Sequence, residues 1–241
     1  MRDLKKVYIY RGIFYIVGLF ILAVGLTLNT KAGLGVSPIL SVPYSISEIW
    51  QLNFGNMTFL VYGIFVLIQI LLHFSQKQFA KERRKLLISD VLQFPLCYAF
   101  TRFLNIFSVC IPDFKTVYAD VMPVRAAVLV AAIICTGIGA AMSLDMRLVP
   151  NPGDGIVQCL SETIHRDVGL AKNLFDCVNL CITFSIGLLS GHLLVGIGVG
   201  TAVAVIGVGR VIAGFNWLFL EKMNRLSGLS ATSRSGSADK K

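Results

Sequence analysis

The strongest constraint on this chain is a series of six long apolar stretches that hold few charges. Each holds roughly 20 residues, the length that crosses a hydrocarbon layer about 30 Å thick at about 1.5 Å per residue. The stretches fall at about residues 10–29, 55–74, 86–110, 124–144, 173–190 and 193–219. Only 15% of the 241 residues are charged and 55% are hydrophobic, whereas a soluble domain carries about 25% charged residues. We therefore expect an all-α, polytopic membrane protein with six transmembrane helices in the lipid bilayer.

Two shorter apolar pieces, each containing glycine and proline, interrupt this series. One runs from Gly33 to Trp50 and the other from Pro150 to Ile164. The helical part of the second piece is about 10 residues, or roughly 15 Å, which is too short to cross the membrane. For the first piece, the distribution of Lys and Arg indicates whether it crosses the membrane, because these residues mark the cytoplasmic ends of membrane helices. The basic N-terminus and the basic loop near residue 80 share a side only if Gly33–Trp50 returns to the face that it enters from.

The same rule predicts that both termini lie in the cytoplasm and that the 111–123 loop lies outside. The net charge of +9 could also indicate a nucleic-acid partner. However, the positive residues gather at the ends of apolar stretches, which is the pattern that orients membrane helices. We expect no nucleic-acid partner. The six cysteines lack metal-ligand spacing and are expected to pack as small apolar residues.

The two halves of the chain follow one pattern: a long helix, a short broken piece and two long helices. Three crossings in each half would orient the halves oppositely, so we expect a 3+3 inverted repeat with two re-entrant helices. The expected units are residues 1–112, residues 122–222 and a disordered cytoplasmic tail at 223–241. A shift of 117 residues lays Ser37 over Asp154 and Asn56 over Asn173. Alternatively, small-residue breaks recur by chance in a glycine-rich chain.

Both short pieces contain helix-start signals. Ser37 precedes Pro38 and Asp154 precedes Gly155; Ser and Asp are favoured N-caps, and proline is favoured at the first helical position. Helix starts carry unpaired N–H groups and about half a positive charge, and broken helices of inverted repeats form transporter sites. The expected substrate-binding residues are Gly35, Ser37, Pro38, Asn56, Gly153, Asp154, Gly155 and Asn173. Alternatively, Asp154 caps an ordinary loop outside the membrane, and Asn56, Lys172 and Asn173 only begin the following helices.

Ionisable residues inside the apolar stretches provide a second signal, because a charge in lipid costs several kcal/mol unless it is paired or hydrated. Arg102 and Arg210 lie in the last helix of each half. We expect one of them to pair with Asp154 or Asp176 and to take part in coupling. Alternatively, each arginine extends to the membrane surface.

Enzyme signatures are not found. The chain has no Gly-x-Ser-Gly, no HExxH and no Tyr-Asp partner for an intramembrane aspartyl protease, and its three histidines lie near helix ends. We therefore expect no catalytic residue, no metal site and no cofactor.

Three strings carry a family resemblance: residues 33–38 (Gly-Leu-Gly-Val-Ser-Pro), residues 152–156 (Pro-Gly-Asp-Gly-Ile) and Gly198-x-Gly200-Thr201. Over about residues 10–220 the chain resembles the bacterial YczE/YyaS/YitT group of integral membrane proteins. The resemblance implies a protein of the bacterial cytoplasmic (inner) membrane with poorly defined activity; some members are associated with production of peptide or polyketide antibiotics. It transfers no catalytic residue.

Two functions remain open at this stage. The first is a small-solute transporter or permease, with an unknown small solute held between Ser37–Pro38 and Asp154–Gly155 and with Asp154 coupling a proton or cation. The second is a non-transporting accessory protein that scaffolds a membrane-associated, biosynthetic assembly. In that case the cytoplasmic Lys77–Lys85 loop, or a second copy of the chain in a homo-oligomer, supplies the interaction.

Overall fold

The computed structural model describes residues 2–229, and all the regular elements in that range are helices. Six of them are long and apolar enough to cross a membrane, as predicted. These are α1 (Arg2–Ala32), α3 (Phe54–Ser75), α4 (Arg83–Cys110), α6 (Met122–Asp145), α8 (Val168–Leu189) and α9 (Val199–Leu226). The shorter helices are α2 (Pro38–Ile49), η1 (Lys77–Phe79), α5 (Phe114–Val117) and α7 (Pro152–Ile164).

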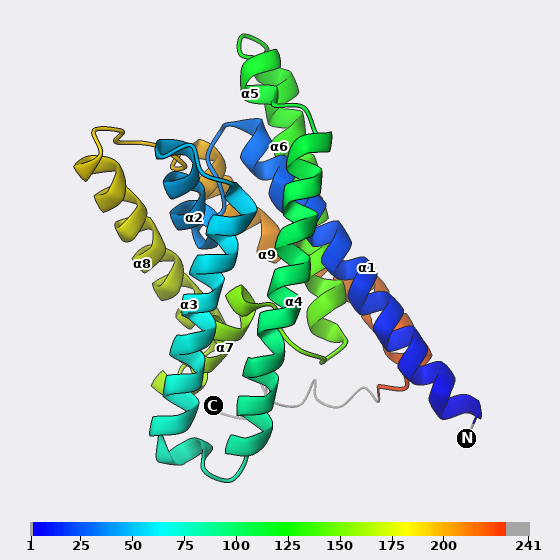
Figure 1. The fold of residues 1–241 in the computed structure, drawn as a ribbon. Coiled ribbons are helices and arrows are strands. Elements are labelled where there is room, and N and C mark those ends of the chain that lie inside the picture. Colours follow the sequence, from blue (N-terminus) through cyan, green and yellow to red (C-terminus); the bar gives the residue numbers. More distant parts are fainter. Residues whose placement is uncertain (1, 230–241) are drawn as a thin grey trace, which may run out of the picture.

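The bundle has two ends, which we name from the elements found there (Figure 1). At the N-terminal end, Nη2 of Arg11 donates a hydrogen bond of 2.8 Å to the carbonyl oxygen of Met146, so α6 ends beside the start of α1. Gly228, just after α9, lies against Val7 at this end. The loop between α3 and α4 lies there too. The α5 end, on the opposite side of the bundle, holds α5 and the start of α6.

The segment that contains α2 enters the bundle from the α5 end and returns to it. Lys115 of α5 packs beside Gly33, where the segment begins, and its Nζ binds Glu48 near the end of α2. Between these points the chain turns inward, and the backbone N–H of Ser37 donates to Oδ1 of Asn29 at 2.9 Å. Pro38 then starts α2 because proline lacks the N–H group that a first helical residue leaves unpaired.

The segment that contains α7 enters the bundle from the N-terminal end and returns to that end. Arg11 reaches the carbonyl oxygen of Arg147, where the segment begins, at 3.3 Å. Near its end, Nε2 of Gln78 donates to the carbonyl oxygen of Glu162 at 3.4 Å. The 12-residue α2 and the 13-residue α7 are therefore both re-entrant helices, as predicted.

The long helices α1 and α6 pack along each other at the centre of the bundle. Glycines permit the approach: a Cβ at Gly25 would lie 2.6 Å from Oγ1 of Thr136, and one at Gly139 would collide with the backbone of Leu22. Each short helix packs against a long helix of the other half, α2 on α8 and α7 on α3. This arrangement brings the starts of α2 and α7 together in the middle of the bundle (Figure 1).

The helix bounds recur at a fixed spacing. Helix α8 begins and ends 114 residues after α3 begins and ends, and Pro152 follows Pro38 by the same 114 residues. The N-cap residues are Ser37 and Asn151, so the predicted shift of 117 residues is wrong, and Asp154 lies in the first turn of α7 instead of capping it. Asp and Asn are comparably good N-caps, so the sequence around residues 151–154 does not distinguish the two positions.

Two predicted boundaries also differ. Helix α9 begins at Val199 instead of near residue 193, because Gly191 and Gly196 adopt positive φ angles of 75° and 82°. There the backbone N–H of Gly200 donates to the carbonyl oxygen of Leu34 at 2.7 Å. Helix α9 also extends to Leu226, past the predicted end of the second unit at residue 222. The predicted disordered tail lies, from residue 230 onward, outside the described residues.

Candidate functional site

A cavity of about 390 Å³ lies where α2 and α7 begin. From these helix starts it is lined by Ser37, Ile39, Asn151, Gly153 and Asp154. Five other helices contribute the walls, with residues such as Leu22 of α1, Tyr62 of α3 and Lys172 of α8. The cavity follows α7 from its first turn to Glu162 in its last turn, so it extends from the middle of the bundle toward the N-terminal end.

The starts of the two short helices touch in this cavity. A Cβ placed on Gly153 would come 2.8 Å from Cδ1 of Ile39 and 3.3 Å from the hydroxyl oxygen of Tyr62. Because Pro38 and Pro152 have no N–H group, Ile39 and Gly153 carry the first backbone donors of the two helices. Neither donor has an acceptor one turn earlier in its own helix. Both residues line the cavity, so both donors are placed to bind a ligand that enters it.

Asn151 supplies a polar side chain that is buried at the same place. The backbone carbonyl oxygen of Asn151 accepts hydrogen bonds from the backbone N–H groups of Asp154 and Gly155, at 2.9 and 2.8 Å. The side chain is only 7% exposed, and its Oδ1 has no hydrogen-bond partner among the described residues. A buried amide oxygen without a partner costs about 1–3 kcal/mol. This cost disappears when a donor enters the cavity.

Two charged side chains line the cavity near the helix starts, and a third, Glu162, lines it at the other end of α7. Asp154 projects from the first turn of α7, and Lys172 from the first turns of α8. Nζ of Lys172 binds Oδ2 of the buried Asp176 at 2.9 Å, which fixes the lysine beside the cavity. The site therefore combines backbone donors, a lysine and a carboxylate, which can bind a small solute that carries both a negative and a positive or donor group.

The predicted binding residues separate into three groups in the structure. Ser37, Gly153 and Asp154 line the central cavity. Pro38 is buried at the first position of α2, and Gly155 lines a second cavity on the other side of α7. The remaining residues lie away from the centre: Gly35 packs on Gly198 at the α5 end, while Asn56 and Asn173 are exposed near the starts of α3 and α8.

The predicted charge pairs are wrong. Nη2 of Arg102 donates to Oδ1 of Asn56 at 2.5 Å, and its guanidinium lies 5.0 Å from the ring centroid of Tyr98. Arg210 is exposed on α9. Asp176 binds Lys172, which precedes it by one helical turn. The physical reason is that a partner one turn away on the same helix, or on the neighbouring helix α3, is closer than one across the bundle.

The second cavity holds a polar cluster that the sequence did not reveal. It measures about 450 Å³ and lies at the N-terminal end between α3, α4 and α7. The buried side chains that line it include Gln69, His73, Asp90 and Gln93. Gly155, in the first turn of α7, packs directly against this cluster, since a Cβ there would lie 2.7 Å from Oε1 of Gln69.

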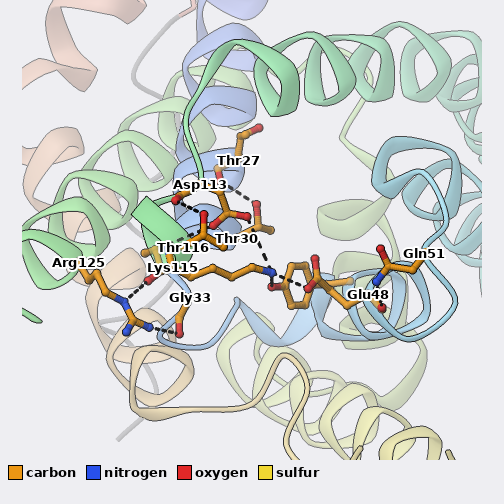
Figure 2. A network of polar contacts seen from close by, with 11 residues as sticks. Thr27, Thr30, Gly33, Glu48, Gln51, Asp113, Lys115, Thr116 and Arg125 are labelled. Carbon is orange, nitrogen blue, oxygen red and sulfur yellow. Dashed lines mark hydrogen bonds and ion pairs between the residues drawn. The ribbon is translucent and has the colours of Figure 1, made fainter. Parts of the chain in front are cut away.

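The α5 end is held by a different polar cluster, formed by Glu48, Asp113, Lys115 and Arg125 (Figure 2). Lys115 extends across this end of the bundle, where its Nζ binds Glu48 and lies 3.5 Å from the hydroxyl of Tyr44. Nη2 of Arg125 donates to the carbonyl oxygen of Gly33 at 2.7 Å. These contacts connect α5 and α6 to α2 and to the end of α1, so we call this group the α5-end cluster.

Most of the lining residues were not predicted from the sequence, among them the polar Asn151 and Tyr62. Asn151 gave a usable signal, because an asparagine directly before a proline is a common helix start. Tyr62 gave none, since a tyrosine in an apolar helix is typical of ordinary packing.

Comparison with known proteins identifies one family that the chain matches. The sequence profile of one family, described as a family of unknown function (DUF6198), matches residues 9–217. No curated protein matches the chain, and no solved structure does. The resemblance to the YczE/YyaS/YitT group gains no support from these comparisons and stays a prediction.

Proposed function

Since this chain belongs to the DUF6198 family, whose function is unknown, we propose an activity from the geometry of the site: the protein transports a small polar solute across the membrane. The solute binds where α2 and α7 begin. The observation that carries this proposal is the meeting of two re-entrant helix starts, at Ile39 and Gly153, in one cavity inside a membrane bundle. Irregular backbone occurs at that depth only where protein or a water-filled cavity covers it.

The proposal includes an inverted repeat, and a contact that recurs in the two halves supports it. Arg11 near the start of α1 donates to the end of α6, and Arg125 near the start of α6 donates to the end of α1. Arg125 follows Arg11 by 114 residues, the spacing that also relates α3 to α8. Two oppositely oriented halves with the same contacts can exchange conformations. Such an exchange opens a central site to one side of the membrane and then to the other.

The lining of the cavities indicates which side is open in this structure. Both cavities extend to residues of the N-terminal end, such as Glu162 and Leu144. The α5 end is spanned by Lys115 and Glu48 instead. We therefore assign this structure to the state that faces the N-terminal end, with the α5-end cluster as the closed side.

The chemistry of the site favours a solute with a carboxylate or another anionic acceptor. The backbone donors of Ile39 and Gly153 and the charge of Lys172 favour a negative group. Asp154 favours a positive group or a hydrogen-bond donor nearby. A volume of about 390 Å³ accommodates a small organic acid or amino acid.

The proposed location is the bacterial cytoplasmic membrane, with both termini in the cytoplasm. The exposed basic residues Lys77, Lys81, Arg84 and Lys85 at the N-terminal end support this orientation. They also favour a second candidate function, in which this loop docks an acidic cytoplasmic protein and the chain acts as an accessory subunit.

Uptake into proteoliposomes tests the proposal. The probes are radiolabelled glycine, lactate, succinate and inorganic phosphate, offered to vesicles containing the purified protein. We expect uptake of at least one probe, and a loss of about tenfold in the Asp154→Asn protein, equivalent to about 1.4 kcal/mol. The matched control is Asp120→Asn, an exposed carboxylate outside the cavity, which should transport normally. Absence of uptake for all four probes, or equal uptake by Asp154→Asn, would contradict the proposal.

A further inference from the structure

The strongest unassigned feature is the polar cluster of the second cavity. Nδ1 of His73 lies 2.7 Å from Oδ2 of Asp90. The exposed fractions of these residues are 4% and 2%. The pair joins α3 to α4 within two helices of membrane-spanning length. An ionisable pair buried inside a bundle of membrane helices is costly, and such pairs commonly mark ion and proton pathways in membrane proteins.

Two glutamines extend the pair toward the central site. Nε2 of Gln93 donates to Oδ1 of Asp90 at 3.4 Å and to Oε1 of Gln69 at 3.0 Å. Nε2 of Gln69 donates back to Oε1 of Gln93 at 3.3 Å. The amide pair packs against Gly155, which follows Asp154 in the first turn of α7. A continuous set of polar groups therefore connects the His73–Asp90 pair with the re-entrant helix that begins at the central cavity.

The pair also faces the cavity of about 450 Å³. The other charged or titratable groups that line this cavity are Lys85 of α4, Arg147 before α7, and Cys159 and Glu162 of α7. They come from α4, from the segment between α6 and α7 and from α7, and they include both signs of charge. Water that enters from the N-terminal end thus meets a polar surface that leads to the pair.

We propose that His73 and Asp90 form a proton-binding site that couples proton movement to solute movement, an inference that rests on the proposed transport function. With a neutral imidazole and a carboxylate the pair carries one negative charge. One proton taken from water gives an imidazolium and a carboxylate, and the pair becomes neutral overall. The neutral pair is less costly to enclose. Closure of the N-terminal side thus follows proton uptake, and the proton is released to water on the other side of the membrane when the α5 end opens. Solute and proton cross together.

The experiment measures solute accumulation and internal pH in the same proteoliposomes, with pyranine trapped inside. The probes are the four labelled solutes used for uptake. In the wild-type protein we expect a transported probe to acidify the lumen. We also expect it to accumulate about tenfold for an inward proton gradient of one pH unit, the ratio for one coupled proton. In Asp90→Asn and His73→Gln we expect exchange of the probe across the membrane to persist, while accumulation and acidification are lost. His192→Gln and Asp120→Asn, both at exposed positions, should behave as wild type.

The outcomes separate the inference from the function on which it rests. If Asp90→Asn accumulates the probe and acidifies the lumen as the wild type does, the coupling role is wrong and transport stands. If no probe moves in the wild type, transport itself is wrong and the coupling role falls with it. Should Asp90→Asn fail to fold, Asp90→Glu and His73→Gln are measured in the same assay, and normal accumulation by both would overturn the inference.

A second measurement reads proton binding without transport. His165→Gln and His192→Gln leave His73 as the only histidine of the three in the chain. In nitrogen NMR spectra of this protein in nanodiscs, we expect the His73 imidazole to change protonation with pH, and Asp90→Asn to shift that transition. A spectrum that is insensitive to both pH and the Asp90 substitution would overturn the assignment of a proton site.

Discussion

Gly153 at the start of α7 and Ile39 at the start of α2 touch: a Cβ at Gly153 would lie 2.8 Å from Cδ1 of Ile39, so a larger residue there requires the Ile39 side chain to move. This contact brings two short helices from different halves of the chain to one point. The proposed function depends on that meeting of helix starts, and so do the predictions about the centre of the bundle.

Enlarging Gly153 should separate the two helix starts. We expect Gly153→Val to lower the free energy of unfolding by about 1–3 kcal/mol, the usual cost of overpacking. Adding Ile39→Ala should recover part of that loss, because it removes the atom that the new side chain meets. Thermal unfolding in detergent measures both effects. Gly209→Val serves as control, since a Cβ at Gly209 meets nothing within 4 Å. If the losses in the free energy of unfolding caused by Gly153→Val and Ile39→Ala simply add in the double variant, the contact between these two residues is contradicted.

Gly35 should tolerate no side chain. Its φ angle is +110°, and a Cβ would lie 2.7 Å from the backbone nitrogen of Gly198. Since the backbone conformation and the close approach both oppose a side chain, we expect Gly35→Ala to destabilise the protein by about 1–3 kcal/mol. The comparison is with Gly209→Ala in the same unfolding assay. A Gly35→Ala protein as stable as wild type would show that the connection between α1 and α2 differs from the one described.

Removing either of the arginines that bind the ends of α1 and α6 should destabilise the bundle. Arg125→Ala leaves the carbonyl oxygens of Ala32 and Gly33 without their donor, and Arg11→Ala does the same to those of Met146 and Arg147. We expect each variant to lose about 1–3 kcal/mol. Arg210→Ala removes an exposed arginine instead and should change stability little. Equal free energies of unfolding in all three variants would contradict a stabilising role for the contacts of Arg11 and Arg125.

The ion pair between Lys115 and Glu48 should affect the access of water-soluble reagents to the α5 end more than it affects the free energy of unfolding. Its side chains are 29% and 37% exposed, so the pair is worth only about 0.2–1 kcal/mol. We expect Lys115→Gln to increase labelling of Tyr44→Cys by an impermeant maleimide, measured in a protein whose six native cysteines are replaced. The charge-swapped protein, Lys115→Glu with Glu48→Lys, should return labelling toward the wild-type level. Equal labelling in all three proteins would contradict a closed α5 end.

The fold was predictable from the sequence because its main determinants are local. Apolar length sets the six long helices, and Pro38 and Pro152 set the starts of the short ones. The register between the halves was predicted wrongly, because Asn151 and Asp154 are both good N-caps and only the structure distinguishes them.

The site was predictable only in part. Ser37, Gly153 and Asp154 follow from the helix-start signals, and they do line the cavity. The pairing of charges and the cluster around His73 and Asp90 depend on which helix faces pack together. Contacts between helices, such as that of Gly155 with Gln69, determine which faces pack together. The spacing of residues within one helix does not reveal such contacts.

Labelling of single cysteines at the two helix starts tests the central claim most directly. Ser37→Cys and Asp154→Cys, each in the protein without native cysteines, are exposed to a membrane-impermeant maleimide from one side of the vesicle membrane at a time. We expect both positions to react from the side that carries the N-terminal end, and from the other side only weakly. Protection of both positions from both sides would contradict a water-filled cavity where α2 and α7 meet.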